Sequence, residues 1–164
     1  LPATRLKTIS ELETIAARFE PLAAYGRLEI INMIMDNLDA ISESATEEQL
    51  KEIFSSTEQI GLKILEAQPN NFLVNQTLFN FYLNLSRSDE AFLNVAEKYA
   101  DKLIDLSPEH INAQEAIIRF TLAKRDFPEA KKWVDKWKEN HPHISIMDKE
   151  KWDYPLGELK NELE

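Results

Sequence analysis

The sequence predicts an all-α protein built from consecutive antiparallel pairs of helices. Apolar residues recur at spacings of three and four along most of the chain, which is the period of one face of an α-helix. Sustained alternation of apolar and polar residues, the mark of a half-buried strand, is not found. Short runs of Ser, Thr, Asn or Pro separate the helical segments, so each helix is expected to turn back along the one before it.

Two helices are predicted before residue 46. Pro21 ends the first, whose apolar stripe consists of Leu6, Ile9, Leu12, Ala16 and Phe19. The second is expected to be a single helix of about five turns, with the stripe Leu22, Tyr25, Leu28, Ile31, Ile34, Leu38 and Ile41.

A third helix is predicted directly after the Ser- and Thr-containing turn at residues 42–46. Thr46 is placed to cap its N-terminus, and Gln49 follows at the spacing of a reciprocal capping box. The helix is expected to stop before Gln68. Its buried stripe is Leu50, Ile53, Thr57, Ile60 and Ile64.

Four further helices are predicted between residues 72 and 138. The fourth spans 72–85, with Leu78, Phe79, Tyr82 and Leu85 apolar. Ser88 is expected to cap the fifth, which runs to Leu106 and carries Ala91, Val95, Ala96, Tyr99, Ala100 and Leu103. The sixth spans 111–124. Asp126 and Glu129 are expected to form a capping box that opens a seventh helix ending at Lys138, with Pro128 in its first turn.

An internal repeat is visible at three prolines that follow helices. Pro69, Pro108 and Pro142 are separated by 39 and 34 residues. Paired helices need small residues where their backbones cross closely and a large apolar residue toward the next pair. Residues 12 and 8 positions before each proline are small or compact, and the residue 5 positions before it is large and apolar. In chain order these residues are Thr57, Gly61 and Ile64; Ala96, Ala100 and Leu103; and Ala130, Val134 and Trp137.

With this register, the chain resembles the tetratricopeptide repeat (TPR) family. Residues 124–130, Lys-Arg-Asp-Phe-Pro-Glu-Ala, resemble the turn inside that family's 34-residue helix pair, and Tyr82 matches its first-helix aromatic. The resemblance implies a right-handed α-solenoid with about seven helices and a C-terminal capping segment. Phe79 and Ile118 depart from the family pattern, because they stand where the family has a small residue. The repeat ending at Pro108 is also about five residues longer than the family's unit.

A second resemblance covers the N-terminal half. The segment 25–30, Tyr-Gly-Arg-Leu-Glu-Ile, followed by Pro69-Asn70-Asn71 and Ser107-Pro108, is similar to the soluble repeat-bearing tails of O-antigen ligase and polymerase-like bacterial membrane proteins. This implies a domain excised from a larger protein, tethered to a membrane, with catalysis in the missing part. The side of the membrane is not implied. The first residue, Leu1, agrees with such an excised domain.

Three segments are predicted along the chain. Residues 1–45 form an N-terminal helical pair, residues 46–142 form the TPR-like array, and residues 143–164 form a capping tail. A repeat array needs such a cap, because its terminal pair otherwise leaves an apolar face in water. The residues expected to dock the tail are Ile144, Ile146, Met147 and Trp152.

The composition excludes several functional classes. The chain of 164 residues has 29 acidic and 19 basic residues, a net charge of −10, so it should repel a nucleic-acid backbone. Three glycines are too few for a phosphate-cradling loop, and the lack of cysteine excludes a thiol nucleophile. The most apolar stretch, 28–35, is interrupted by Glu29 and Asn32 and is too short to span a bilayer.

Polar clusters in the chain favour structural roles over chemistry. The sequence His141-Pro142-His143 lacks a third ligand at metal spacing, so no metal and no cofactor are expected. Paired carboxylates such as Glu47 and Glu48 suit the first turn of a helix. No catalytic residue is predicted, and this chain is not expected to be an enzyme.

Two surfaces have open interpretations. The basic segment 124–138 is interpreted as a solvated outer face, with an acidic partner or anionic lipid as the alternative. Trp137 is expected in the core, whereas Trp133 is expected partly outside, where stacking on a sugar ring is possible.

The predicted binding surface is the groove lined by the first helix of each pair. Asn and Gln there can bond a peptide backbone or sugar hydroxyls. The main hypothesis is therefore an interaction or scaffold domain that docks a protein or peptide segment, and the alternative is an accessory domain that contacts glycan. The groove residues predicted are Gln76, Asn80, Leu83, Asn112, Glu115 and Arg119.

Overall fold

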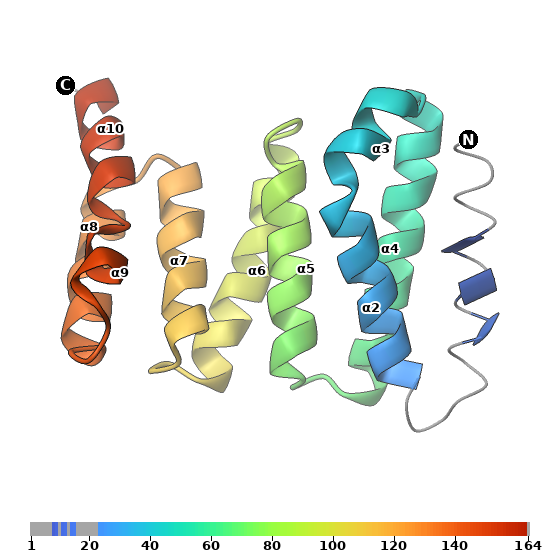
Figure 1. Ribbon diagram of the computed structural model, residues 1–164, viewed down its shortest axis with the longest axis horizontal. Helices are drawn as coiled ribbons and strands as arrows, with labels where there is room; N and C mark the ends of the chain where they lie inside the picture. Colours follow the sequence, from blue (N-terminus) through green and yellow to red (C-terminus); the bar gives the residue numbers. More distant parts are fainter. Residues whose placement is uncertain (1–7, 10, 13, 16–22, 164) are drawn as a thin grey trace. The chain divides into compact units, whose positions relative to one another are not determined.

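The computed structural model describes residues 8, 9, 11, 12, 14, 15 and 23–163, and all regular structure in them is helical (Figure 1). The predicted all-α class is therefore confirmed. The helices with defined bounds are α2 (Ala23–Asp36), α3 (Leu38–Ser44), α4 (Glu47–Ala67), α5 (Phe72–Leu85), α6 (Ala91–Leu106), α7 (Ile111–Ala123), α8 (Phe127–Asn140), α9 (Ile146–Glu150) and α10 (Asp153–Leu163).

The chain divides into two compact units, residues 1–77 and 78–164, with the division inside α5. In the first unit α2 packs against α4. Its core is dominated by isoleucine, whose branched side chain fills the space between helices: Ile9, Ile30, Ile31, Ile34, Ile41, Ile53 and Ile60. Of the first predicted helix, Ile9 is buried and Leu12 is half-buried, whereas Leu6, Ala16, Phe19 and Pro21 lie outside the described residues.

The prediction of one continuous helix from Leu22 to Ile41 is wrong, because the helix breaks at Asn37. The Asn37 amide Nδ2 donates to the carbonyl of Met33 at 2.8 Å, and its backbone N–H bonds to Ile34 at 3.2 Å. An asparagine side chain that bonds a nearby carbonyl competes with the helical ladder, and α3 begins anew at Leu38. Tyr25, placed on the buried stripe, is 68% exposed.

The start and end of α4 agree with the sequence. Thr46 and Gln49 form the reciprocal capping box, with Thr46 Oγ1 accepting from the Gln49 N–H at 3.3 Å and Gln49 Oε1 accepting from the Thr46 N–H at 3.0 Å. Two orphan donors of the first turn are thereby satisfied. The helix ends at Ala67, before Gln68, as predicted.

In the second unit each helix turns back along its predecessor, so that α6, α7 and α8 run antiparallel in sequence order (Figure 1). Aromatic contacts join the second half of α5 to α6, where the ring of Tyr82 stacks on that of Tyr99 at 5.7 Å. The cap predicted for α6 is wrong. Asp89, not Ser88, accepts the Ala91 N–H at 2.9 Å, because the chain makes another turn after α5 before the helix begins.

The repeat register predicted from the three prolines is confirmed as a pattern of burial. The residues at all nine offset positions are buried, with exposures of 1% or less at the eight positions other than Gly61. The two departures from the family pattern, Phe79 and Ile118, are also buried, at 1% and 0%. Small side chains are therefore buried on α6 and α8, both of which pack against α7, and large buried side chains lie beside them along each helix.

The turn between α7 and α8 depends on a left-handed residue. Arg125 has φ of 60°, the Asp126 N–H bonds to the carbonyl of Thr121 at 3.0 Å, and the Arg125 N–H bonds to that of Leu122 at 3.0 Å. These two bonds are those of the Schellman motif, in which glycine is the usual left-handed residue. An arginine therefore occupies a position where a Cβ is unfavourable.

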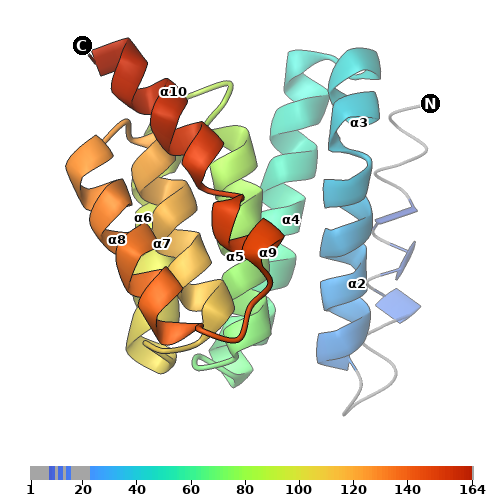
Figure 2. The ribbon, with the colours of Figure 1, turned by 60° about the vertical axis from the view of Figure 1, so that its left-hand side comes forward.

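The C-terminal segment packs on the last helix pair, and both views show α10 beside α8 (Figure 2). Trp152 is buried against Ile118, Val134 and Trp137, and Ile144 packs against this cluster half-buried. The side chains of Ile146 and Met147 lie outside the described residues. The predicted division into segments 1–45, 46–142 and 143–164 stays a prediction.

We predict that Ala100→Leu lowers the free energy of unfolding by about 1–3 kcal/mol, because the added carbons must fit a fully packed helix contact. Urea unfolding measures the change. The control is Ala91→Leu on the same helix, where the side chain is exposed and the change should stay within about 0.5 kcal/mol. Equal effects of the two substitutions would contradict the repeat register.

Candidate functional site

The least buried side of α7 is a single stripe. Asn112, Glu115, Arg119 and Leu122 are half-buried, and they are three or four residues apart. Residues so spaced lie on one face of a helix. Their neighbours Ala113, Ala116 and Ile118 are buried. Three of the residues predicted to line the groove, Asn112, Glu115 and Arg119, therefore share one face.

A matching stripe runs along α5. Gln76, Asn80 and Asn84 are each half-buried and follow one another at intervals of four residues. Leu83, also predicted for the groove, is only 8% exposed, so little of its side chain is available to a ligand. Gln76 lies one turn before Asn80 but belongs to the first unit, whereas Asn80 and Asn84 belong to the second, with α7.

Arg119 joins the two stripes. Its guanidinium Nη1 donates to Asn80 Oδ1 at 2.6 Å, and its Cζ lies 5.7 Å from the centre of the Phe79 ring. Burial lowers the pKa of the Arg119 guanidinium, Glu115 raises it and Arg87 lowers it, and the group stays charged at neutral pH. A half-buried cation therefore lies between α5 and α7, among the residues predicted to line the groove.

The C-terminal segment closes one side of the α7 stripe. Lys151 lies between α9 and α10, and its Nζ is 2.5 Å from Glu115 Oε1. The same ammonium is 5.0 Å from the ring centres of Trp137 and Trp152. A cation over aromatic faces is stabilised by the negative charge of those faces. Lys151 thus fixes Glu115 and the buried tryptophans together.

The start of α7 is held by its preceding loop. His110 Nδ1 accepts the Asn112 N–H at 3.2 Å and so caps the helix. Gln114 is fully buried, and its Nε2 donates to the carbonyl of Pro108 at 2.9 Å. These bonds give His110 a structural role and fix the position of Asn112.

The basic segment 124–138 is largely paired with acids. Lys131 bonds Asp135 at 2.5 Å, and Lys138 bonds Asp153 of α10 at 2.7 Å. Lys124 lies 3.5 Å from Glu97 of α6. Intramolecular carboxylates therefore offset much of the positive charge, which agrees with the interpretation of this segment as an outer face.

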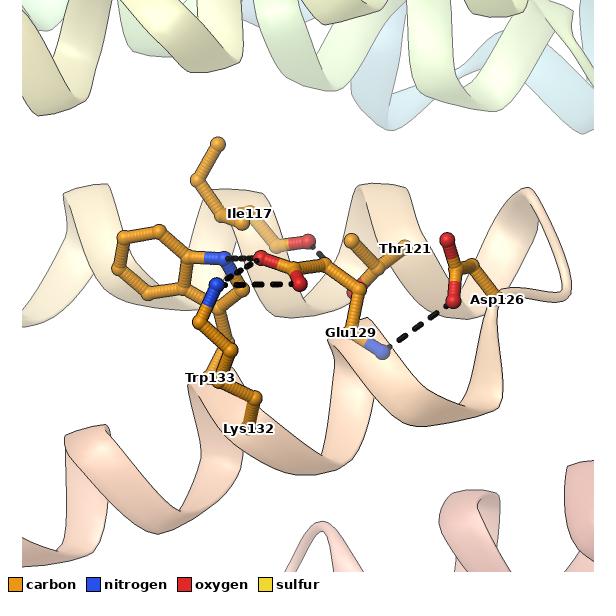
Figure 3. A network of polar contacts seen from close by, with 6 residues as sticks. All are labelled: Ile117, Thr121, Asp126, Glu129, Lys132 and Trp133. Atoms are coloured by element: carbon orange, nitrogen blue, oxygen red, sulfur yellow. Dashed lines mark hydrogen bonds and ion pairs between the residues drawn. The ribbon is translucent and has the colours of Figure 1, made fainter.

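Glu129 is the centre of a polar network on α8 (Figure 3). Its carboxylate accepts from the Trp133 indole N–H at 2.8 Å and from Lys132 Nζ at 2.9 Å. The predicted capping box is only half formed. Asp126 accepts the Glu129 N–H at 3.2 Å, but the Asp126 N–H bonds to Thr121 instead, because the left-handed turn directs it there.

The histidine motif and the carboxylates do not assemble a metal site in the part of the chain that the structure describes. No group of three or more His, Asp or Glu residues there could hold a metal ion. His141 packs edge-on against Trp137 at 5.6 Å, and His143 is exposed. Among the described helices, none is long and apolar enough to cross a membrane.

Two polar residues at the end of α5 were not predicted from the sequence, Asn84 within the helix and Arg87 in the turn after it. Asn84 continues the α5 stripe in place of Leu83. Arg87 is exposed in the turn after α5, and its N–H bonds to the Asn84 carbonyl at 3.3 Å. The four-residue spacing of Gln76, Asn80 and Asn84 in the sequence could have identified Asn84 as part of this stripe.

We predict that Asn80 and Arg119 are energetically coupled. A double-mutant cycle of Asn80→Ala and Arg119→Ala, followed by urea unfolding, should give a coupling of about 1 kcal/mol, because the charged bond is half-buried. The exposed pair Lys131 and Asp135 is the control, with an expected coupling below about 0.5 kcal/mol. Additive effects at Asn80 and Arg119 would show that the bond does not join the helices.

Comparison with known proteins gives no further assignment. No protein-family model, curated protein or solved structure matches this chain. The resemblances to tetratricopeptide repeats and to O-antigen ligase tails therefore stay predictions, and the joined polar stripes of α5 and α7 are the basis for a proposed function.

Proposed function

We propose that this chain is a noncatalytic interaction domain of tetratricopeptide type, a right-handed α-solenoid that docks a protein segment in the groove of α5 and α7. In this proposal it is the soluble part of a larger, membrane-associated bacterial protein. The domain serves as a scaffold that brings a partner to the rest of that protein.

The bond between Arg119 and Asn80 is the observation that carries the proposal. It joins polar stripes on two helices that are not consecutive in the chain, so a ligand placed there meets both helices at once. The half-buried residues offer amide groups, which both donate and accept hydrogen bonds as a peptide backbone requires. The Asn84 side-chain amide makes no hydrogen bond to the described residues and is open to such a ligand.

The repeat register supports the same proposal. Small residues at Ala96, Ala100 and Ala130 are fully buried at the helix contacts, as stacked helix pairs require. Stacked pairs present their first helices on one surface, where repeat proteins hold extended ligands. Glu47, one of the paired carboxylates considered for acid–base chemistry, has a structural partner in Lys51.

Direct contact with glycan is the weaker alternative. Trp133 is the tryptophan predicted to lie partly outside the core, where it could stack on a sugar ring. In the structure Lys136 Nζ lies 4.4 Å from the centre of the Trp133 ring, and Glu129 binds its N–H. Neighbouring side chains therefore engage one face of this ring and its N–H, which leaves less of it for stacking on a sugar.

Site-specific crosslinking tests the proposal. We expect a photoreactive phenylalanine at position 84 or 112, in the full-length protein in its own cells, to form adducts with a protein. The matched control is position 132, an exposed lysine on α8, where no such adduct is expected. Adducts at all three positions alike, or at position 132 alone, would contradict docking in the groove. An adduct lost on glycosidase treatment but not on proteolysis would favour the glycan alternative.

A further inference from the structure

Arg119 is a half-buried guanidinium that forms no ion pair with a described residue. No carboxylate of the described residues lies within 4.0 Å of it, although the chain has ten more acidic than basic residues. Several other cationic side chains of the second unit are paired with carboxylates. Lys151 pairs with Glu115, Lys138 with Asp153, and Arg125 with Glu162. A buried charge normally has a partner, so the surroundings of Arg119 are incomplete.

The guanidinium has donors to spare. Only Nη1 is bonded to a described residue, Asn80, and the plane is held over the Phe79 ring. An arginine carries five N–H donors in a rigid fork that matches the two oxygens of a carboxylate. The fork is therefore positioned before any ligand arrives, and this reduces the entropy lost on binding.

A second arginine lies in the turn that follows α5. The Arg87 N–H bonds to the carbonyl of Asn84, which is one helical turn after the Asn80 that bonds Arg119. It too lacks a carboxylate partner among the described residues, and its charge acts on Arg119. Two like charges that repel each other are both stabilised by an anion bound between them.

We propose that Arg87 and Arg119 form an anchor for the side-chain carboxylate of an acidic protein segment bound in the groove. This rests on the proposed function and names the chemistry of the partner. The one acidic group that acts on Arg119 is Glu115, which is already bonded to Lys151. Lys151 therefore neutralises Glu115, and the positive charges of Arg87 and Arg119 favour an anionic ligand.

A peptide fits the anchor better than an acidic sugar or a phosphate. The half-buried amides of Asn80 and Asn84 are one helical turn apart on α5, and Arg87 lies in the turn that follows. Amides that donate and accept can bond the backbone on either side of an anchored Asp or Glu. Glu115 beside Arg119 would repel a dianionic phosphate more strongly than a carboxylate.

Binding of two synthetic peptides to the 164-residue chain tests the anchor. One peptide alternates Glu and Ala, and the other alternates Gln and Ala. We expect the Glu peptide to bind and to weaken with added salt, measured by fluorescence anisotropy. Arg87→Gln and Arg119→Gln should each weaken it about 5- to 10-fold, which corresponds to about 1.0–1.4 kcal/mol. Arg125→Gln, at an exposed and paired arginine, is the control and should leave binding unchanged. Because Arg87 is exposed, Arg87→Gln is expected to fold, and it still tests the anchor if Arg119→Gln does not fold.

The outcomes separate the anchor from the groove itself. Equal binding of the Glu and Gln peptides would overturn the anchor but leave peptide docking standing. No binding of either peptide at millimolar concentration, with protein adducts still formed at positions 84 and 112, would also overturn the anchor alone. Tighter binding of oligogalacturonate than of the Glu peptide would overturn the choice of a protein segment. An equal loss in the Arg125 variant would show a nonspecific charge effect and reject the site.

Discussion

The close contact of helices at small residues is the constraint on which the second unit depends. Ala96 and Ala100 on α6 and Ala130 on α8 have no exposed surface, and each helix packs against α7. Only small side chains let two backbones approach in this way. The larger residues beside them, Leu103 and Trp137, then fill the remaining space to the density of a protein interior. Because α7 is enclosed by both neighbours, a single narrow stripe of it stays accessible.

That stripe gains its chemistry from residues far apart in the chain. Arg119 bonds to Asn80, 39 positions earlier, and Glu115 bonds to Lys151, 36 positions later. The first bond fixes a cation between helices, and the second fixes a carboxylate at the edge. The groove therefore depends on tertiary contacts on both sides of α7, although each of its residues is an ordinary polar side chain.

The C-terminal segment acts as more than a cover for apolar surface. Trp152 buries itself against Trp137, with ring centres 6.5 Å apart, and both rings lie near the ammonium of Lys151. Ion pairs from Lys138 to Asp153 and from Arg125 to Glu162 connect α10 to the preceding pair at two further points. Exposed ion pairs contribute little each, so the buried tryptophans supply most of the stability of this contact.

The sequence by itself determined the class of fold, most helix boundaries and the positions of close helix contact, because these follow from local period, caps and residue size. Thr46 with Gln49, and the nine positions before the prolines, needed no knowledge of the tertiary structure. The tertiary structure alone decided the break at Asn37, the left-handed Arg125, and that Asn84 rather than Leu83 continues the half-buried stripe of α5. Helix α5 is apolar on nearly every side, so its period does not say which face the neighbouring helices leave open. Only packing against α6 and α7 settles that, and it is packing that brings Arg119 to Asn80.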